Sequence, residues 1–539
     1  MDQIQQSRRH LRIPAAVLLC IITAFIGVSI CSMNSFLYPM NDWLDINCFY
    51  TVGRGMFHGL VPYRDLYEQK GPLLYFLYGL ADLAFPSSYL GAWLLEWIAG
   101  ACFLWLFYKT LRLFTESKAL WIIPVAAFAV FGSFAFAKGG SAEELCLPFF
   151  MGAVYVCLRY FVKEPSAPMP CGAVAVQGGC AGCVFWIKFT LVGLYAAWAV
   201  VLIVFYCRRG FIKQLFIAAA LFIAGFAVAA LPWFIYFGVN GAVGDWLSVY
   251  ISDNIFLYAG RADSGVADAV FDRLGSFFRD LACNVFFTAP AWAGMIYATV
   301  RRKAVGLNGW FVAAVWSMFG ALALGVYIGS KIYYYYCLPL SVFAAVFALP
   351  CARFAARVKG TEDPSVSLSE EGDVSCVKRK KLMSAAALAL AVVLCGAGCF
   401  AVSGNTFSAG GKDAMFPQLT IAEYIREDSE NRGEEITLLN FAGLDGGIYR
   451  AVGAAPPVRY FAALNVATEE MTEKQFELLE QHGVRYVVTY KDSGREKLRG
   501  LPEYELVYEQ TYYPGEVYRF VTTRTWSFYR LSSEYTVQT

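Results

Sequence analysis

The sequence has few charged residues and almost no histidine. Asp, Glu, Lys and Arg make up 16% of the 539 residues, whereas a soluble domain carries about 25%. This deficit excludes an ordinary soluble enzyme. The three histidines, His10, His58 and His482, are too few and too scattered for a histidine-based metal site or catalytic triad. The net charge of +2 gives no indication of a nucleic-acid partner.

Cysteine is common, but its placement does not indicate a disulfide scaffold. Most of the 16 cysteines lie inside apolar runs, where cysteine behaves as a small hydrophobic residue, and none follows Cys399. The CxxC formed by Cys180 and Cys183 lies in a run of small residues, which favours close helix packing over a metal site. The chemistry of the protein must therefore come from carboxylates, lysines and tyrosines.

Long apolar runs dominate the sequence, of which 58% is hydrophobic. Runs of roughly 20 apolar residues are long enough to cross a bilayer as a helix. The first run lacks a cleavage site and is too long for a signal peptide, so we expect it to be retained. The sequence predicts a polytopic α-helical membrane protein with about eleven transmembrane helices. These runs lie at about 13–37, 89–108, 119–137, 145–162, 171–187, 189–207, 214–238, 282–300, 308–330, 333–351 and 383–403.

The distribution of lysine and arginine gives an orientation. Cytoplasmic loops carry an excess of these residues, and every alternate loop of this chain is basic if the N-terminus is cytoplasmic. The strongest example is Lys378-Arg379-Lys380-Lys381. We therefore expect a multi-pass plasma-membrane protein with a cytoplasmic N-terminus. An odd number of spans then places the C-terminal part outside.

Two domains are predicted, with a boundary near residue 403. The transmembrane domain, 1–403, carries a first outer loop at 38–88, a second large outer loop at 240–280 and a polar cytoplasmic linker at 352–382. Residues 404–539 form an extracytoplasmic α/β domain. Its expected helices are 418–431 and 468–482, and its expected strands are 436–441, 484–490, 504–511 and 517–522. We expect this domain to offer little chemistry and to act as a lid, an acceptor-recognition module or a structural support.

Ionisable residues near the predicted outer face are the main candidates for function. Such groups are costly beside a membrane unless they are paired or line an aqueous cavity. One outward-facing cavity lined by acids and bases would use them together. The candidates are Asp42, Asp45, Arg64, Asp65, Lys70, Glu143, Glu144, Lys188 and Lys331, with Tyr336 in the run Tyr333–Tyr336.

The order of motifs in the first outer loop resembles a known family. The chain reads Asn41-Asp42-Trp43-Leu44-Asp45, then Gly59-Leu60-Val61-Pro62-Tyr63-Arg64-Asp65, then Lys70-Gly71-Pro72 before an apolar run. This order resembles integral-membrane GT-C glycosyltransferases, especially bacterial ones akin to protein mannosyltransferases and aminoarabinose transferases. The stretch Gly140-Ser141-Ala142-Glu143-Glu144-Leu145 resembles the second outer motif, although Ala142-Glu143 stands where Asn-Thr is common. The similarity covers about residues 8–350.

The resemblance implies a sugar donor carried on a polyisoprenyl phosphate. Transfer needs a carboxylate that accepts the proton of the attacking hydroxyl. Asp45 best matches the family acid, with Asp42 as a helper or substitute, and the spacing of the two leaves the choice open. Cations must stabilise the departing phosphate, and Lys70 is the first candidate. Arg64, Lys188 and Lys331 come next, and Glu143 or Glu144 would orient a hydroxyl or bind a divalent ion.

Each candidate also has a structural interpretation. Asp42 could cap a helix that begins near Asp45, and Asp65 could hold a local turn. Glu143 and Glu144 could stabilise the N-terminus of a helix. Lys70 and Lys188 could be snorkelling interface residues, and the tyrosine run could be an aromatic belt.

The sequence leaves several functional alternatives open. The main competitor is a transporter or flippase of lipid-linked glycans, for which Glu96 inside the second run is the best single residue. The sugar, the lipid carrier and the acceptor (a glycan, a lipid or a protein) are not determined. The use of Mg²⁺ or Mn²⁺ is also open, because carboxylates serve equally as metal ligands and as proton acceptors.

Overall fold

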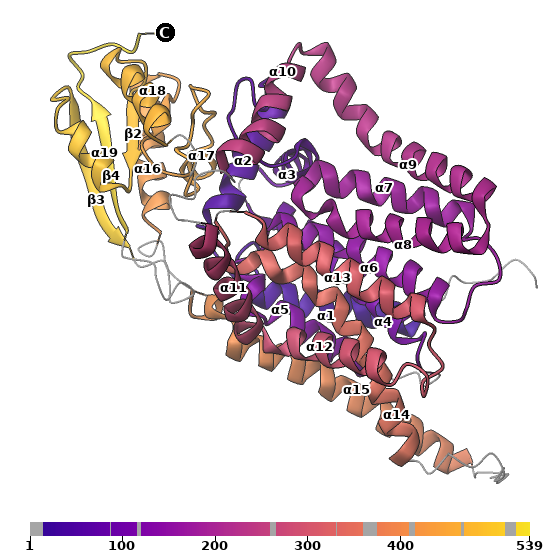
Figure 1. Cartoon of the computed structure of the whole chain (residues 1–539). Helices are drawn as coiled ribbons and strands as arrows, with labels where there is room; N and C mark the ends of the chain where they lie inside the picture. Colours follow the sequence, from indigo (N-terminus) through magenta and orange to yellow (C-terminus); the bar gives the residue numbers. More distant parts are fainter. Residues whose placement is uncertain are drawn as a thin grey trace, which may run out of the picture.

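The computed structural model places a small α/β unit at one end of a bundle of long helices (Figure 1). It describes residues 14–86, 88–115, 120–258, 266–329, 331–358, 374–408, 416–464, 468–512 and 524–538.

Each of the eleven predicted apolar runs contains a helix. Seven helical segments of the described residues are at least 18 residues long and apolar enough to cross a membrane, and α11 with α12, bent by 103°, would make an eighth. The chain is therefore a multi-pass membrane protein. The helices of these runs are α1 (Ala15–Cys31), α4 (Leu90–Leu111), α5 (Ile122–Phe131), α6 (Ala142–Phe161), α7 (Cys171–Lys188), α8 (Gly193–Arg209), α9 (Ile212–Val239), α12 (Val285–Val300), α13 (Gly309–Tyr327), η5 (Tyr334–Phe347) with α14 (Ala348–Val358), and α15 (Val374–Val402).

The longest of the seven segments, Cys171–Arg209, is a helical hairpin. The backbone of Lys188 is extended, with φ of −155°, and the short 3₁₀ turn η3 (Phe189–Val192) follows it. The Tyr206 hydroxyl near the end of α8 accepts a hydrogen bond of 2.8 Å from the backbone N–H of Met169, just before α7. The two helices therefore run back past each other, in agreement with the two spans predicted at 171–187 and 189–207.

Small residues bring α7 and α9 into close contact. A Cβ added at Gly178 would lie 2.0 Å from the carbonyl oxygen of Phe222, and one at Gly225 would lie 2.0 Å from that of Ala175. Only glycine permits this approach of two helices in a membrane. The run around Cys180 and Cys183 therefore serves helix packing, as predicted.

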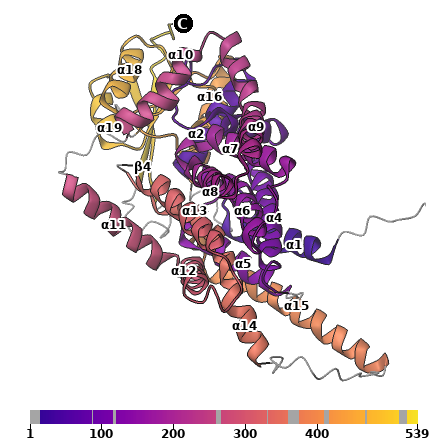
Figure 2. The same ribbon diagram turned by 45° about the vertical axis from the view of Figure 1, so that its right-hand side comes forward.

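The two large loops that the sequence predicts to be outer are themselves helical. The first contains α2 (Leu44–Phe57) and α3 (Pro72–Ala84). The second contains α10 (Val243–Trp246), the π-helical segment η4 (Leu247–Tyr258) and α11 (Val266–Cys283). Figure 1 shows α2, α3 and α10 at the end of the bundle next to the α/β unit, and Figure 2 shows α11 on its periphery.

Helices extend into both ends of the linker predicted at 352–382. Helix α14 continues to Val358, and α15 begins at Val374. The residues between them, 359–373, lie outside the described residues.

The C-terminal unit contains a four-stranded sheet in the order β1-β2-β4-β3. Strands β1 and β2 are parallel, and the other pairs are antiparallel. Three strands lie where the sequence predicts them, whereas the fourth begins at Arg524 and the strand predicted at 517–522 lies outside the described residues. The elements are α16 (Pro417–Arg432), β1 (Leu438–Asn440), α17 (Ile448–Val452), α18 (Thr468–Glu480), β2 (Tyr486–Thr489), α19 (Asp492–Leu498), β3 (Tyr504–Tyr512) and β4 (Arg524–Leu531); the short 3₁₀ turns η2 (Phe134–Phe136) and η6 (Gly404–Ser408) lie in the bundle.

Buried polar contacts dock this unit onto α2 and α3. The guanidinium of Arg450 pairs with Asp82 and lies 3.7 Å from the centroid of the Tyr50 ring. Asp445, which is fully buried, accepts a hydrogen bond of 2.6 Å from the Thr51 hydroxyl. Burial raises the pKa of the Asp445 carboxyl to about 6. The unit is thus held on α2 and α3 by buried groups that need polar partners.

Candidate functional site

The candidate residues line two cavities rather than the single cavity expected from the sequence. The first has a volume of about 400 Å³ and combines lysines with a largely apolar wall. Lys70, Lys188 and Lys331 contribute the charge. The apolar wall is formed by Phe189, Leu191, Val192, Ala321, Leu324, Val326 and Ile328, among others. Such a lining suits a ligand with an anionic head and an apolar tail.

The Lys70-Gly71-Pro72 motif brings two of these lysines together. Gly71 packs so closely on the end of α7 that a Cβ would lie 1.9 Å from the carbonyl oxygen of Trp186. Its N–H donates a hydrogen bond of 3.0 Å to the carbonyl of Ile187, the residue before Lys188. Pro72 begins α3, where the backbone N–H has no acceptor within the helix, so its absence in proline loses no hydrogen bond. The motif therefore seats Lys70 against the turn that carries Lys188.

Buried polar groups hold the Lys70 loop in place. The hydroxyl of Tyr63 donates a hydrogen bond of 2.6 Å to the carbonyl of Lys70. The carboxylate of Glu68 accepts a hydrogen bond of 2.8 Å from the Lys70 N–H and another from the Tyr75 hydroxyl. The arrangement requires a left-handed backbone at Tyr63, whose φ of 71° is unfavourable for a residue other than glycine.

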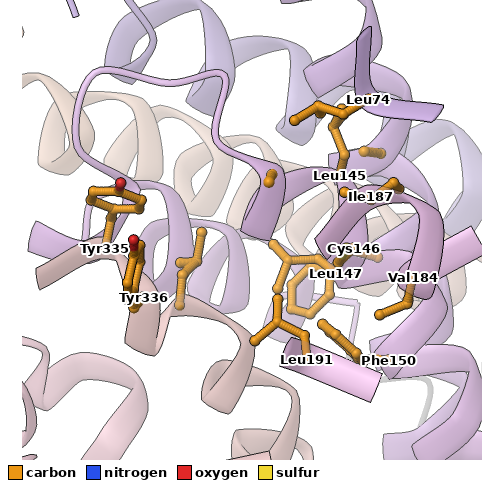
Figure 3. Close-up of a cluster of buried hydrophobic side chains, with 14 of the residues drawn as sticks. Leu74, Leu145, Cys146, Leu147, Phe150, Val184, Ile187, Leu191, Tyr335 and Tyr336 are labelled. Carbon is orange, nitrogen blue, oxygen red and sulfur yellow. The ribbon is translucent and has the colours of Figure 1, made fainter. Parts of the chain in front are cut away.

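Lys188 lies between an acid and an aromatic ring. Its ammonium donates to Glu143 over 2.5 Å and lies 3.4 Å from the centroid of the Tyr336 ring. Glu143 is buried and is used by this pair. Figure 3 shows Tyr335 and Tyr336 beside the apolar cluster that Leu147, Val184 and Leu191 help to form. Lys188 is thus held by a paired carboxylate at the edge of a packed core.

The second cavity has a volume of about 260 Å³ and is rich in charge. Asp42, Asp45 and Lys138 line it from the membrane part, and Lys491 and Arg524 line it from the C-terminal unit. The remaining lining residues are Trp43, Leu44, Tyr333, Tyr334, Tyr335 and Leu444.

The two acids of this cavity differ in their surroundings. Asp42 is buried, pairs with the ammonium of Lys138 and accepts a hydrogen bond of 3.1 Å from the Tyr512 hydroxyl. Burial lowers the pKa of Lys138, which Asp42 opposes. Asp45 is half-buried in the first turn of α2, and one of its oxygens accepts a hydrogen bond of 2.5 Å from Tyr335. Asp42 is not the cap of α2, since Trp43 holds that position without a side-chain hydrogen bond.

The tyrosine run separates the two cavities. Tyr333, Tyr334 and Tyr335 face the second cavity, and Tyr336 lines the first. The rings of Tyr335 and Tyr336 meet edge to face with their centroids 4.8 Å apart. Asp45 therefore lines the polar cavity and is hydrogen-bonded to the tyrosine run, whose last residue lines the lysine-bearing apolar cavity.

Four predicted site residues, Arg64, Asp65, Glu143 and Glu144, line neither cavity. Arg64 and Asp65 pair with each other over 2.8 Å, and Asp65 also accepts a hydrogen bond of 2.7 Å from the Val61 N–H. Arg64 holds the pKa of Asp65 below its usual range. These contacts agree with the structural interpretation in which Asp65 holds a local turn. Glu144 forms a capping box with Ser141 at the start of α6.

The sequence interpretation missed the residues that the fold supplies from far away. Lys138, Lys491, Arg524 and Tyr512 all face the second cavity or its acids. The C-terminal unit thus contributes charge to the second cavity, contrary to the expectation of little chemistry. In the described part of the chain, no group of three or more His, Cys, Asp or Glu side chains is placed to hold a metal ion.

The architecture of this chain is similar to that of several solved structures. Crystal structures of ArnT from Cupriavidus metallidurans, in the apo state and bound to undecaprenyl phosphate, both have a TM-score of 0.56. They are 13% and 14% identical, and each match covers 97% of this chain and 98% of the other. The Archaeoglobus fulgidus oligosaccharyltransferase matches with a TM-score of 0.48 and 15% identity over 93% of this chain and 73% of the other. The two ArnT structures therefore show that this chain shares their fold.

The comparisons by sequence cover less of the chain than the comparisons by structure. Residues 6–169 match the family model of the competence-induced Ccs4 N-terminal domain. A comparison with curated proteins finds no match.

Proposed function

We propose that the protein is a glycosyltransferase that moves a sugar from a polyisoprenyl-phosphate donor to an acceptor on the extracytoplasmic side of the membrane. The position of Asp45 carries this proposal, because it lines the second cavity and is hydrogen-bonded to the tyrosine run that reaches the first cavity. The likeness to ArnT, one structure of which contains undecaprenyl phosphate, supports it.

The donor occupies the first cavity. Its isoprenoid chain lies against the apolar wall, and its phosphate lies near Lys70, Lys188 and Lys331. Lysine binds phosphate as a point charge. In this cavity it also stabilises the negative charge that develops as the phosphate leaves.

The acceptor enters the second cavity, where Asp45 is the base. As the acceptor oxygen bonds to the anomeric carbon, the bond between that carbon and the phosphate oxygen breaks. The bonding pair leaves with the polyisoprenyl phosphate, and the hydroxyl proton passes to Asp45. Tyr335 orients the carboxylate through its hydrogen bond. Asp42 is already paired with Lys138 and acts as a positioning residue.

The test is transfer of radiolabelled sugar from polyprenyl-phosphate donors by the purified full chain. Asp45→Asn removes the base but keeps the shape, so we expect at least about a hundredfold loss of transfer with undecaprenyl-phosphate binding retained. Asp65→Asn is the matched control, because an amide oxygen still accepts from Val61 and Asp65 lines neither cavity. Equal activity of Asp45→Asn and the native chain would contradict the assignment of the base. Absence of transfer with every donor, together with vesicle uptake of the lipid-linked sugar, would favour the transporter.

A further inference from the structure

The C-terminal unit supplies the second cavity with two cations, Lys491 and Arg524. Lys491 precedes α19, and Arg524 begins β4. Within the described ranges neither side chain forms a salt bridge; Asp492, the acid nearest in sequence, pairs with Arg495 instead. Both cations lie over the ring of Tyr490, at 5.5 Å for the ammonium and 5.2 Å for the guanidinium.

Placing these two charges together is unfavourable without an anion. Partial burial and the charge of Arg524 both lower the pKa of Lys491. Of the two carboxylates that line this cavity, Asp42 is paired with Lys138, and Asp45 accepts a hydrogen bond from the neutral Tyr335 hydroxyl. The cavity thus contains three cations and two carboxylates.

We propose that Lys491 and Arg524 form an anion subsite that binds a phosphate group on the acceptor and directs its hydroxyl to Asp45. This inference rests on the proposed glycosyltransferase function and adds the chemical class of the acceptor. A planar guanidinium offers paired donors to phosphate oxygens, and an ammonium adds a point charge. A neutral sugar or hydroxyl acceptor would not require either group.

The position of the subsite fits this role. Arg524 and Lys491 line the same cavity as Asp45, and Leu444 completes that wall. The Tyr490 hydroxyl donates a hydrogen bond of 3.0 Å to the Leu444 carbonyl, which fixes the ring beneath the two cations. The donor lysines lie in the other cavity, beyond the tyrosine wall. A phosphate on the acceptor and a phosphate on the donor therefore have separate sites.

The test measures binding of sn-glycerol 3-phosphate, with glycerol as the uncharged comparison, by calorimetry on the purified full chain. The donor cavity is first saturated with undecaprenyl phosphate. We expect the phosphate probe to bind at least about tenfold more tightly than glycerol. The double variant Lys491→Gln, Arg524→Gln removes this difference. Lys497→Gln, on the same helix α19 but beside Phe476, leaves it unchanged.

The outcomes separate this inference from the proposed function. Unchanged probe binding by the double variant would overturn the anion subsite, as would loss of probe binding when undecaprenyl phosphate is present. Failure of undecaprenyl phosphate itself to bind would overturn the proposed function. In that case, a dependence of probe binding on Lys491 and Arg524 would still support the subsite.

Discussion

Asp42 and Lys138 form an ion pair that is almost wholly buried, with side-chain exposures of 1% and 3%. Removing one partner of such a pair leaves an uncompensated charge, which costs about 3–5 kcal/mol. We therefore expect Asp42→Ala to lower the melting temperature of the full chain markedly. The double variant Asp42→Leu, Lys138→Met replaces both charges with apolar groups and recovers most of the stability. Thermal unfolding in detergent measures both effects.

The same variants separate structure from chemistry. Asp42→Asn keeps the size of the side chain and one acceptor for Lys138, so we expect it to retain more transfer activity than Asp45→Asn. An Asp42→Ala variant as stable as the native chain would show that the pair contributes nothing. Complete loss of transfer in a stable Asp42→Asn variant would make Asp42 the base.

The turn between Lys70 and α3 depends on its contact with the end of α7. Gly71→Ala would place a methyl group 1.9 Å from the Trp186 carbonyl oxygen, so the Lys70 loop must move away from Lys188. Because both lysines line the donor cavity, we expect undecaprenyl-phosphate binding to weaken at least about tenfold. Titration of the purified chain with the fluorescently labelled lipid measures this change.

A matched glycine is available in α7 itself. A Cβ added at Gly172 meets no atom within 4 Å, so Gly172→Ala should bind the lipid as the native chain does. Native affinity in a folded Gly71→Ala variant would mean that the seating of Lys70 on α7 does not position the donor.

The helices and strands were easier to predict from the sequence than the contacts between them. An apolar run must form a helix to cross a bilayer, because no water satisfies its backbone groups, so each run contains a helix. The break at Lys188 was also visible, because a cation interrupts the apolar run. In contrast, the partners Asp42 and Lys138 are 96 residues apart, and Asp42 and Tyr512 are 470 apart. No local pattern indicates such contacts, and the roles of Lys491 and Arg524 depend on them.

A pH-sensitive side chain lies at the contact between the C-terminal unit and the membrane part. Asp445 is buried at this contact, and burial raises the pKa of its carboxyl to about 6. When the unit is undocked and the group is exposed, its pKa returns to about 4. Docking therefore favours the protonated form. Its stabilisation is full below about pH 4 and is lost as the pH rises through about 6.

This contact predicts a weaker docked state at higher pH. We expect docking to weaken on the order of tenfold between about pH 5 and about pH 7. Cys48, which is buried in α2 near Asp445, reports undocking through its alkylation rate, followed by peptide mapping. The variant Asp445→Asn is neutral at every pH and serves as the reference. Dividing the Cys48 labelling rate of the native chain by that of the variant at each pH removes the intrinsic pH dependence of the thiol. The native-to-variant ratio of Cys48 labelling should rise with pH. A constant ratio would mean that Asp445 does not couple protonation to docking.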